Sequence, residues 1–102
     1  MDPSLRDTLA MSPGTVTRHD GRGRYELEID GEVVAFADFS ADADRLTIPY
    51  IETAPQHRNK GYSSMLMDGV IDDLRTRGIQ VRATCSVARA HIAANAAELL
   101  VR

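Results

Sequence analysis

An Asp-Gly pair at positions 30 and 31 lies between two stretches in which apolar and polar residues alternate, and it constrains the fold more than any other local feature. Alternation over 24–30 has the period of a strand with one buried face. Asp-Gly is typical of a two-residue hairpin turn, because the central positions of that turn require positive φ angles. The turn predicts antiparallel strands with these pairs on one face: Ile29 with Glu32, Leu27 with Val34, and Tyr25 with Phe36. Ala35 and Ala37 are then expected on the opposite face.

Further elements follow from periodicity along the rest of the chain. A helix is expected over 62–77, because apolar side chains recur there at four-residue spacing, at Tyr62, Leu66, Val70 and Leu74. The other expected elements are a short strand over 15–19, a polar turn over 40–44, a strand over 45–52, a β-branched strand over 79–84 and an alanine-rich helical segment over 87–100, broken near Asn95. Antiparallel hairpins followed by one strand-helix-strand crossover indicate an α+β fold.

Pro49 interrupts the strand expected over 45–52. A proline cannot donate a hydrogen bond to a sheet ladder, so we expect this strand to be bulged or splayed from a neighbour at that point. A splay leaves backbone groups unpaired. Such groups can bind an extended ligand as if it were another strand.

The length of 102 residues suits one domain with one hydrophobic core. We expect a flexible leader over 1–13, which has no sustained period, and a single domain over 14–102. The net charge of −3 argues against broad nucleic-acid binding, which relies on a basic surface. No apolar run approaches the roughly 20 residues that span a bilayer, so membrane insertion is not expected.

The single cysteine, Cys85, cannot form an internal disulfide, and the first residues lack the charged-then-apolar order of a signal peptide. Both observations indicate a reducing, cytoplasmic setting. The three histidines are not closely spaced, so no structural metal site is expected.

The segment 56–64 leads into the helix expected over 62–77 and has the composition of an anion-binding loop. Gly61 and Ser63 are small, and Arg58 and Lys60 carry positive charge. The first backbone N–H groups of a helix have no intrahelical partner, and the helix dipole adds partial positive charge, so a pyrophosphate fits there. Glycine and basic residues are also common in ordinary loops before helices, and the loop alone leaves both interpretations open. A Walker A loop is excluded, because it requires Gly-Lys followed by Ser or Thr.

The proline-disturbed strand and the anion-type loop are close together in the sequence. The strand can bind an extended, amide-containing arm, and the loop can bind a pyrophosphate. Coenzyme A has both parts.

These residues resemble the GNAT-type N-acetyltransferases, whose acetyl-CoA loop has Arg or Gln, two residues, Gly, one residue, then Gly or Ala. The segment 58–63 matches this pattern with serine in the last small position. From about Arg24 to Leu100 the chain also resembles a short subgroup of predicted acetyltransferases that are little more than the cofactor-binding core. The matching features are Tyr25-Glu26-Leu27, Asp30-Gly31, Ala35-Phe36-Ala37-Asp38, Glu52 with Thr53, and Cys85.

The resemblance implies a GNAT-like mixed sheet in the order β-β-β-β-α-β-α, a reduced acyl-CoA N-acyltransferase core with acetyl-CoA as the acyl donor. Unpaired N–H groups over 49–52 would hold the pantetheine arm and the thioester oxygen. The implied cofactor-binding residues are Ile51, Thr53, His57, Arg58, Asn59, Lys60, Gly61, Tyr62, Ser63 and Ser64.

The resemblance also implies catalytic roles for Glu52, Cys85 and His91. Glu52 is the candidate base, acting through water, or a solvated glutamate at a strand end. Cys85 accepts the acetyl group covalently, lies beside the thioester and positions it, or is a small core residue. Subgroup members usually have proline after the cysteine and an aromatic residue soon after, whereas here Ser86 follows it. His91 is then the available substitute for a tyrosine acid, or a histidine on the helix surface.

Two functions from different classes follow. The first is an N-acetyltransferase that acts on an unidentified amine or a protein lysine. The second is a non-catalytic acyl-CoA-binding module or partner subunit, because the helices that ordinary GNAT enzymes insert after their first strand are absent. A protein-interaction domain with an exposed sheet edge is a third possibility. The sequence identifies neither the acceptor nor the oligomeric state.

Overall fold

The computed structural model describes residues 14–42 and 44–101. Its strands are Thr15–His19 (β1), Arg24–Ile29 (β2), Glu32–Asp42 (β3), Arg45–Thr53 (β4) and Gln80–Ala83 (β5). Its α-helices are Tyr62–Arg77 (α2) and Ser86–Asn95 (α3), and short 3-10 turns cover Asp20–Arg22, Pro55–His57 and Ala97–Leu99. The predicted leader over 1–13 lies outside the described residues.

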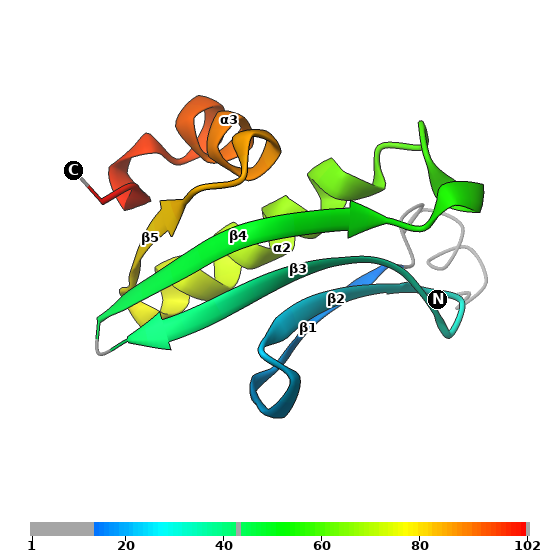
Figure 1. Cartoon of the computed structure of the whole chain (residues 1–102), viewed down its shortest axis with the longest axis horizontal. Helices are drawn as coiled ribbons and strands as arrows, with labels where there is room; N and C mark the ends of the chain where they lie inside the picture. The colour runs from blue at the N-terminus through cyan, green and yellow to red at the C-terminus, as the bar shows by residue number, and fades with distance from the viewer. Residues whose placement is uncertain (1–13, 43, 102) are drawn as a thin grey trace, which may run out of the picture.

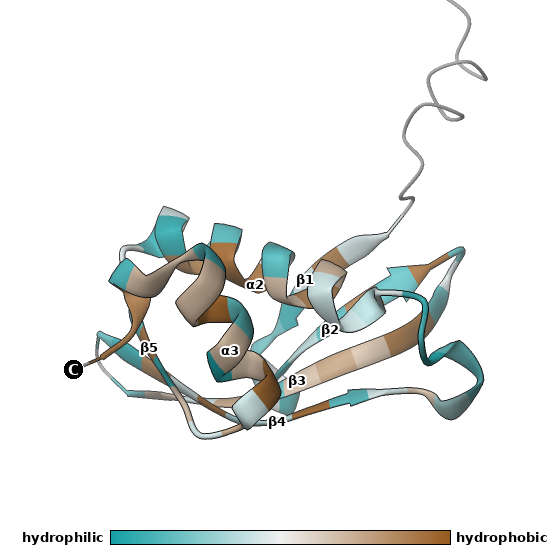
Figure 2. Cartoon of the chain, turned by 90° about the horizontal axis from the view of Figure 1, so that it is seen from above, coloured by the Kyte–Doolittle hydropathy of each residue, from teal (hydrophilic) through white to brown (hydrophobic). Residues whose placement is uncertain are grey.

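The strands form one five-stranded sheet in the order β1-β2-β3-β4-β5. The first four strands pair antiparallel, and β5 pairs parallel with β4 after the crossover through α2 (Figure 1). Helices α2 and α3 lie on one side of this sheet (Figure 2). On the other side, the described part of the chain places no helix, and we call that side the open face. The predicted α+β order of elements is confirmed.

The turn at Asp30 and Gly31 forms as predicted, with φ angles of 51° and 82°. Ile29 pairs with Glu32, also as predicted, but a β-bulge then shifts the register by one residue. Val34 is the extra residue, so Leu27 pairs with Ala35 and Tyr25 with Ala37. The predicted Leu27–Val34 and Tyr25–Phe36 pairs are therefore wrong. A one-residue shift moves side chains to the other face, which is why both alanines lie in the core.

One of the two remaining boundaries differs from the prediction, and the other agrees with it. The polar segment over 40–44 is mostly strand, because β3 continues to Asp42 and pairs Ser40 with Thr47. Polar side chains are compatible with strand there because the residues at the end of β3 are exposed. The break expected near Asn95 is confirmed, since α3 ends at that residue.

The disturbance predicted at Pro49 is confirmed. The register between β3 and β4 shifts between Asp38 and Ser40, opposite Ile48 and Pro49. Pairing between β4 and β5 stops at Ile48. The carbonyl of Ile48 accepts hydrogen bonds from the backbone N–H groups of Thr84 and Cys85 at 3.1 and 3.3 Å. Beyond this point β4 continues beside β3 alone, and the sheet opens between β4 and the chain that leaves β5.

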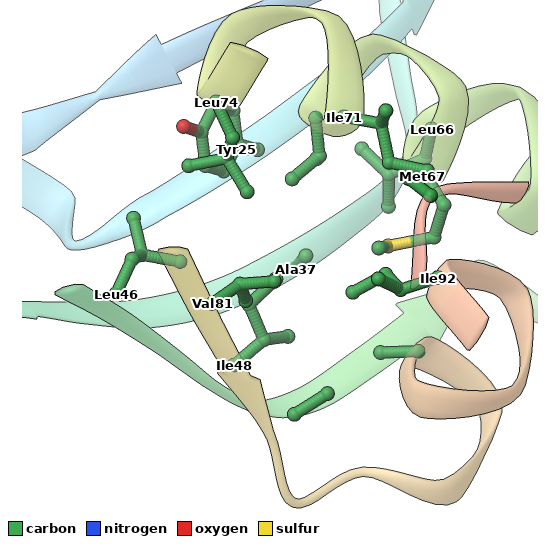
Figure 3. Packing of buried hydrophobic residues seen from close by; sticks show 14 of the residues in the cluster. Tyr25, Ala37, Leu46, Ile48, Leu66, Met67, Ile71, Leu74, Val81 and Ile92 are labelled. Atoms are coloured by element: carbon green, nitrogen blue, oxygen red, sulfur yellow. The ribbon is translucent and has the colours of Figure 1, made fainter. Parts of the chain in front are cut away.

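The core lies between the sheet and the two helices (Figure 3). Helix α2 buries one apolar stripe, formed by Leu66, Met67, Val70, Ile71 and Leu74. Tyr25 is 1% exposed, and its hydroxyl donates a 2.6 Å hydrogen bond to Asp73 at the edge of the same helix. Burial and this carboxylate raise the pKa of the Tyr25 hydroxyl, so the phenol stays neutral. The contact fixes the helix across the sheet.

Gly69 lets α2 approach β1 closely. A Cβ atom added to Gly69 would lie 2.4–2.5 Å from the Cγ2 and Cβ atoms of Val16. Contacts this short require the backbone or the valine to move. The glycine in the middle of this helix is therefore explained by packing.

Replacing Gly69 with alanine is expected to lower the free energy of unfolding by about 1–3 kcal/mol, because the new methyl group overpacks the contact with Val16. Intrinsic helix propensity alone would favour alanine by about 1 kcal/mol. The sign of the change in the free energy of unfolding therefore distinguishes overpacking from helix propensity. Urea denaturation measures the change. Gly21→Ala is the matched control, since an added Cβ there meets nothing within 4 Å. Equal stability of Gly69→Ala and the unmodified chain would contradict the close approach.

Candidate active site

The opening between β4 and β5 continues into a cleft with a volume of about 420 Å³. One wall is the end of β4, and the other is the loop that leads into α2, with one side chain from α3. The lining residues are Tyr50, Ile51, Glu52, Thr53, His57, Arg58, Asn59, Gly61, Tyr62, Ser63 and Val87. We call this the main cleft.

Most of the residues predicted to bind the cofactor line the main cleft. The structure brings together Ile51, Thr53, His57, Arg58, Asn59, Gly61, Tyr62 and Ser63, and it adds Glu52 from the predicted catalytic set. Lys60 is exposed outside the lining, and Ser64 lines a second cleft. Tyr50 and Val87 are lining residues that the sequence analysis did not select. Tyr50 carried a usable signal, because it directly follows Pro49 at the predicted disturbance.

The loop backbone has two residues in the left-handed region before α2. Asn59 and Gly61 have φ angles of 66° and 76°, and a Cβ added to Gly61 would meet open space. Glycine is therefore favoured at 61 by backbone conformation rather than by crowding. Helix α2 begins at Tyr62 with no side-chain cap. Its first N–H groups therefore have no capping side-chain oxygen, and Gly61, Tyr62 and Ser63 line the cleft, which suits a bound anion.

His57 connects this loop to the β2–β3 hairpin. Its Nε2 atom lies 2.9 Å from Oε2 of Glu32, and its ring centroid lies 5.9 Å from that of Tyr62. The contact with His57 lowers the pKa of the Glu32 carboxyl, so that group is charged near neutral pH. The Nδ1 atom of His57 is buried and has no hydrogen-bond partner among the described atoms. A buried polar atom without a partner is a group that a ligand can satisfy.

Glu52 and Tyr50 lie on the same side of β4, two residues apart, and the Tyr50 hydroxyl donates a short hydrogen bond to Oε1 of Glu52. This hydrogen bond raises the pKa of the Tyr50 hydroxyl, with the charges of Glu52 and Asp38 adding to the effect. Tyr50 is 46% exposed, so the pair is open to solvent. The Tyr50 hydroxyl, a neutral donor, therefore holds the Glu52 carboxylate at the rim of the main cleft.

Cys85 occupies the point where β5 ends and α3 begins. It is half-buried, packs against the core, and lines neither the main cleft nor the second cleft, between α2 and α3. Its backbone N–H is bonded to Ile48, so it is fixed beside the opening between the strands.

His91 lines a second cleft, between α2 and α3, with a volume of about 430 Å³. Its Nε2 atom lies 2.8 Å from Oδ1 of Asp68 on α2. The second cleft shares Ser63 and Val87 with the main cleft. Glu52 and His91 therefore line adjoining clefts rather than the same one.

Two other properties of the described residues bear on function. No group of three or more His, Cys, Asp or Glu side chains that could hold a metal ion occurs over 14–42 and 44–101. No helix within those ranges has the length and apolarity to cross a bilayer.

A sheet that opens beside an uncapped helix N-terminus offers unpaired backbone groups of the kind that suit an extended, phosphate-bearing ligand. Residues 24–99 match the family of GCN5-related N-acetyl-transferases. The chain belongs to this family, whose acyl donor is acetyl-CoA. The matched region extends from the start of β2 to the 3-10 turn after α3.

A comparison with an individual relative also points to acetyltransferases. Over 61 residues the chain is 43% identical to streptothricin acetyltransferase of Streptomyces lavendulae. The match covers 58% of this chain and 32% of that protein, so the chain spans about a third of that relative's length.

Solved structures show the same fold. A GCN5-like putative N-acetyltransferase from Staphylococcus aureus has a TM-score of 0.64 and 14% identity, over 89% of this chain and 91% of that one. The ribosomal-protein-S18-alanine N-acetyltransferase of Escherichia coli has a TM-score of 0.58 and 20% identity, over 94% of this chain and 60% of that one. N-acetylglutamate synthase from Neisseria gonorrhoeae, in complex with coenzyme A and N-acetyl-glutamate, has a TM-score of 0.52 and 25% identity, over 78% of this chain and 21% of that one.

Proposed function

We propose that this chain binds acetyl-CoA in the main cleft and transfers its acetyl group to an amine, either a small molecule or a protein lysine. The observation that carries the proposal is the placement of the strand opening after Ile48 next to the uncapped start of α2 at Tyr62. Membership of the family indicates acetyl-CoA as the acyl donor. The strand opening can hold its pantetheine arm, and the start of α2 can hold its pyrophosphate.

The residues of the main cleft fit this cofactor. Backbone groups of β4 beyond Ile48 no longer pair with β5, and they can hydrogen-bond the amide groups of a pantetheine arm. The N–H groups at the start of α2, with Arg58 beside them, suit the pyrophosphate. The unpartnered Nδ1 atom of His57 adds a polar group that a ligand can satisfy. Lys60 lies outside the lining, and its positive charge can still attract the pyrophosphate.

Glu52 is proposed as the general base. Bound acetyl-CoA supplies the acetyl group in activated form, as a thioester. The acceptor amine must lose a proton to become a neutral nucleophile, and a carboxylate at the rim of the cleft can take that proton directly or through one water. Tyr50 positions this carboxylate through its hydrogen bond. The contact of His91 with Asp68 supports a structural role between α2 and α3 for that histidine.

A non-catalytic acyl-CoA-binding module is the alternative function. The open face favours it, because the described residues place no helix there to enclose an acceptor. Both functions require cofactor binding, and only the first requires Glu52.

Arg58→Gln combined with Lys60→Gln is expected to weaken acetyl-CoA binding, because both changes remove positive charge beside the proposed pyrophosphate position. The unmodified chain should gain about 2.7 kcal/mol of stability at a ligand concentration one hundred times the Kd, and the double variant less. Thermal unfolding with and without acetyl-CoA measures the gain. Arg45→Gln, an exposed arginine at the start of β4, is the control. If acetyl-CoA stabilises none of these proteins, both proposed functions are wrong.

Glu52→Gln is expected to reduce kcat/KM for amine acetylation by about a hundredfold or more, because general-base catalysis contributes about 10²–10⁴-fold. Stabilisation by acetyl-CoA should remain, since the amide keeps the shape of the side chain. Glu28→Gln is the control, because it removes the same charge from a strand next to β3. Acetylation assays with a panel of amines give the rates. Undiminished turnover by Glu52→Gln would refute the assignment of the base, and absence of turnover in the unmodified chain would favour the binding module.

Cys85 is proposed to act as a structural residue beside the cofactor rather than as a covalent acceptor. It lines neither cleft, and His91, a histidine six residues further along that could activate the thiol, contacts Asp68 instead. Nucleophilic use of a cysteine depends on such an activating partner. After incubation with acetyl-CoA and acid denaturation, mass spectrometry is expected to find Cys85 unmodified. An acetyl group on this residue, absent from Cys85→Ala, would establish the covalent route instead.

A further inference from the structure

The second cleft, between α2 and α3, is a cavity that the proposed acetyl transfer leaves unused. Its volume of about 430 Å³ is close to the 420 Å³ of the main cleft. Helix α2 contributes Ser63, Ser64 and Met67 to its lining, and α3 contributes one side, from Val87 to Asn95. Both helices lie on the same side of the sheet (Figure 2). The second cleft therefore follows the groove between them.

The two clefts meet at the start of α2. Ser63 and Val87 line both of them, and Gly61 and Tyr62 line the main cleft. The proposed position of the pyrophosphate is thus at the junction of the clefts. Two arms leave the pyrophosphate of coenzyme A, the pantetheine arm and the adenosine. The strand opening beyond Ile48 can hold the first arm, and the second cleft adjoins the place from which the other arm departs.

The chemistry of the second cleft suits a nucleoside better than a phosphate. Among the described residues, no lysine or arginine lines it. Asp68 contacts His91 of the lining at 2.8 Å, which adds a carboxylate beside the cleft. Ala90 and Ala94 are exposed and one helical turn apart, so α3 presents a strip of methyl groups, and the lining also includes Met67. Apolar surface and a methionine both suit a flat aromatic base.

Asn95 adds a polar group at the far end of the cleft. Its Nδ2 atom donates a hydrogen bond to the His91 carbonyl at 2.9 Å, and its Oδ1 atom accepts none from the other described residues. An asparagine amide can pair with the N6 and N7 atoms of adenine. The helix rises about 12 Å from Val87 to Asn95, which gives an adenosine enough length.

We propose that the second cleft binds the adenosine of acetyl-CoA, with the base on the methyl groups of Ala90 and Ala94 and its exocyclic amine at Asn95. This inference rests on the proposed function, and it assigns a position to the part of the cofactor that the main cleft does not hold. His91 is then a residue of the nucleoside pocket rather than an acid for the departing thiolate. Ser64, which the resemblance assigned to cofactor binding, contacts the cofactor from this cleft.

Ala90→Leu narrows the second cleft and leaves the lining of the main cleft unchanged. The Kd for coenzyme A is expected to rise at least about tenfold, because burial of about 60 Å² of apolar surface corresponds to that factor. The Kd for 4′-phosphopantetheine, which lacks the adenosine, should not change. Ala93→Leu is the matched control, since Ala93 is an exposed alanine of α3 outside the lining. Isothermal titration calorimetry measures both affinities.

The position of the base can also be measured directly, because a chain of 102 residues is accessible to NMR. Nuclear Overhauser effects are expected from the H2 and H8 protons of bound adenine to the methyl groups of Ala90 and Ala94. ADP should give the same contacts. It has no pantetheine arm and carries no acetyl group, so it probes the second cleft independently of acetyl transfer.

The outcomes separate this inference from the proposed function. If coenzyme A binds and its adenine protons contact neither methyl group, the nucleoside site is overturned and the proposed donor remains. Equal losses of coenzyme A affinity in Ala90→Leu and Ala93→Leu would overturn the site as well. If ADP gives the contacts while coenzyme A fails to bind or no amine is acetylated, the nucleoside site stands and the acetyl-transfer function fails. If neither ligand binds, both are wrong.

Discussion

The hydrogen-bond pairing between β4 and β5 stops at Ile48, and the rest of the molecule is arranged around that break. The Ile48 carbonyl ends the ladder by accepting two N–H groups from the chain that leaves β5. Pro49 follows directly and has no N–H group to donate, and the register between β3 and β4 shifts opposite it. A buried sheet would be destabilised by unpaired backbone groups at such a place. Here they lie at the wall of a cleft, where a ligand can pair with them.

The loop that leads into α2 depends on a second set of contacts. Its left-handed positions, Asn59 and Gly61, turn the chain into α2 so that the helix begins at the cleft. His57 fixes the loop to Glu32 in the β2–β3 hairpin, at the end of the sheet where that hairpin turns. The helix itself is held by its apolar stripe and by the contact of Tyr25 with Asp73. The cleft is therefore supported from strands that contribute nothing to its lining.

The sequence predicted the element order, the opening at Pro49 and most of the cleft, because each of these depends on local chemistry. The alternation of β2, the spacing of α2 and the missing N–H of Pro49 can all be recognised within a few residues. The bulge at Val34 could not be predicted from the turn, since Val34 is buried in the core and its carbonyl accepts a hydrogen bond from Ala54, twenty positions further along the chain. Register beyond a turn is a tertiary property.

Side-chain partners across elements were likewise beyond sequence reasoning. The resemblance left His91 as the available substitute for a tyrosine acid on the last helix, but its actual neighbour is Asp68, on another helix. Tyr50 was treated as one of the alternating residues of a strand. Its contact with Glu52 became evident only with both side chains placed on the same side of β4. Proximity in sequence predicts neighbours along one element and says little about contacts between two.

The main cleft takes all of its lining except Val87 from one continuous stretch, Tyr50 to Ser63. The last helix thus supplies a single apolar contact to it. Substitutions in α3 outside Val87 therefore leave the lining of the main cleft unchanged, whereas almost any substitution between Tyr50 and Ser63 alters it or a direct neighbour.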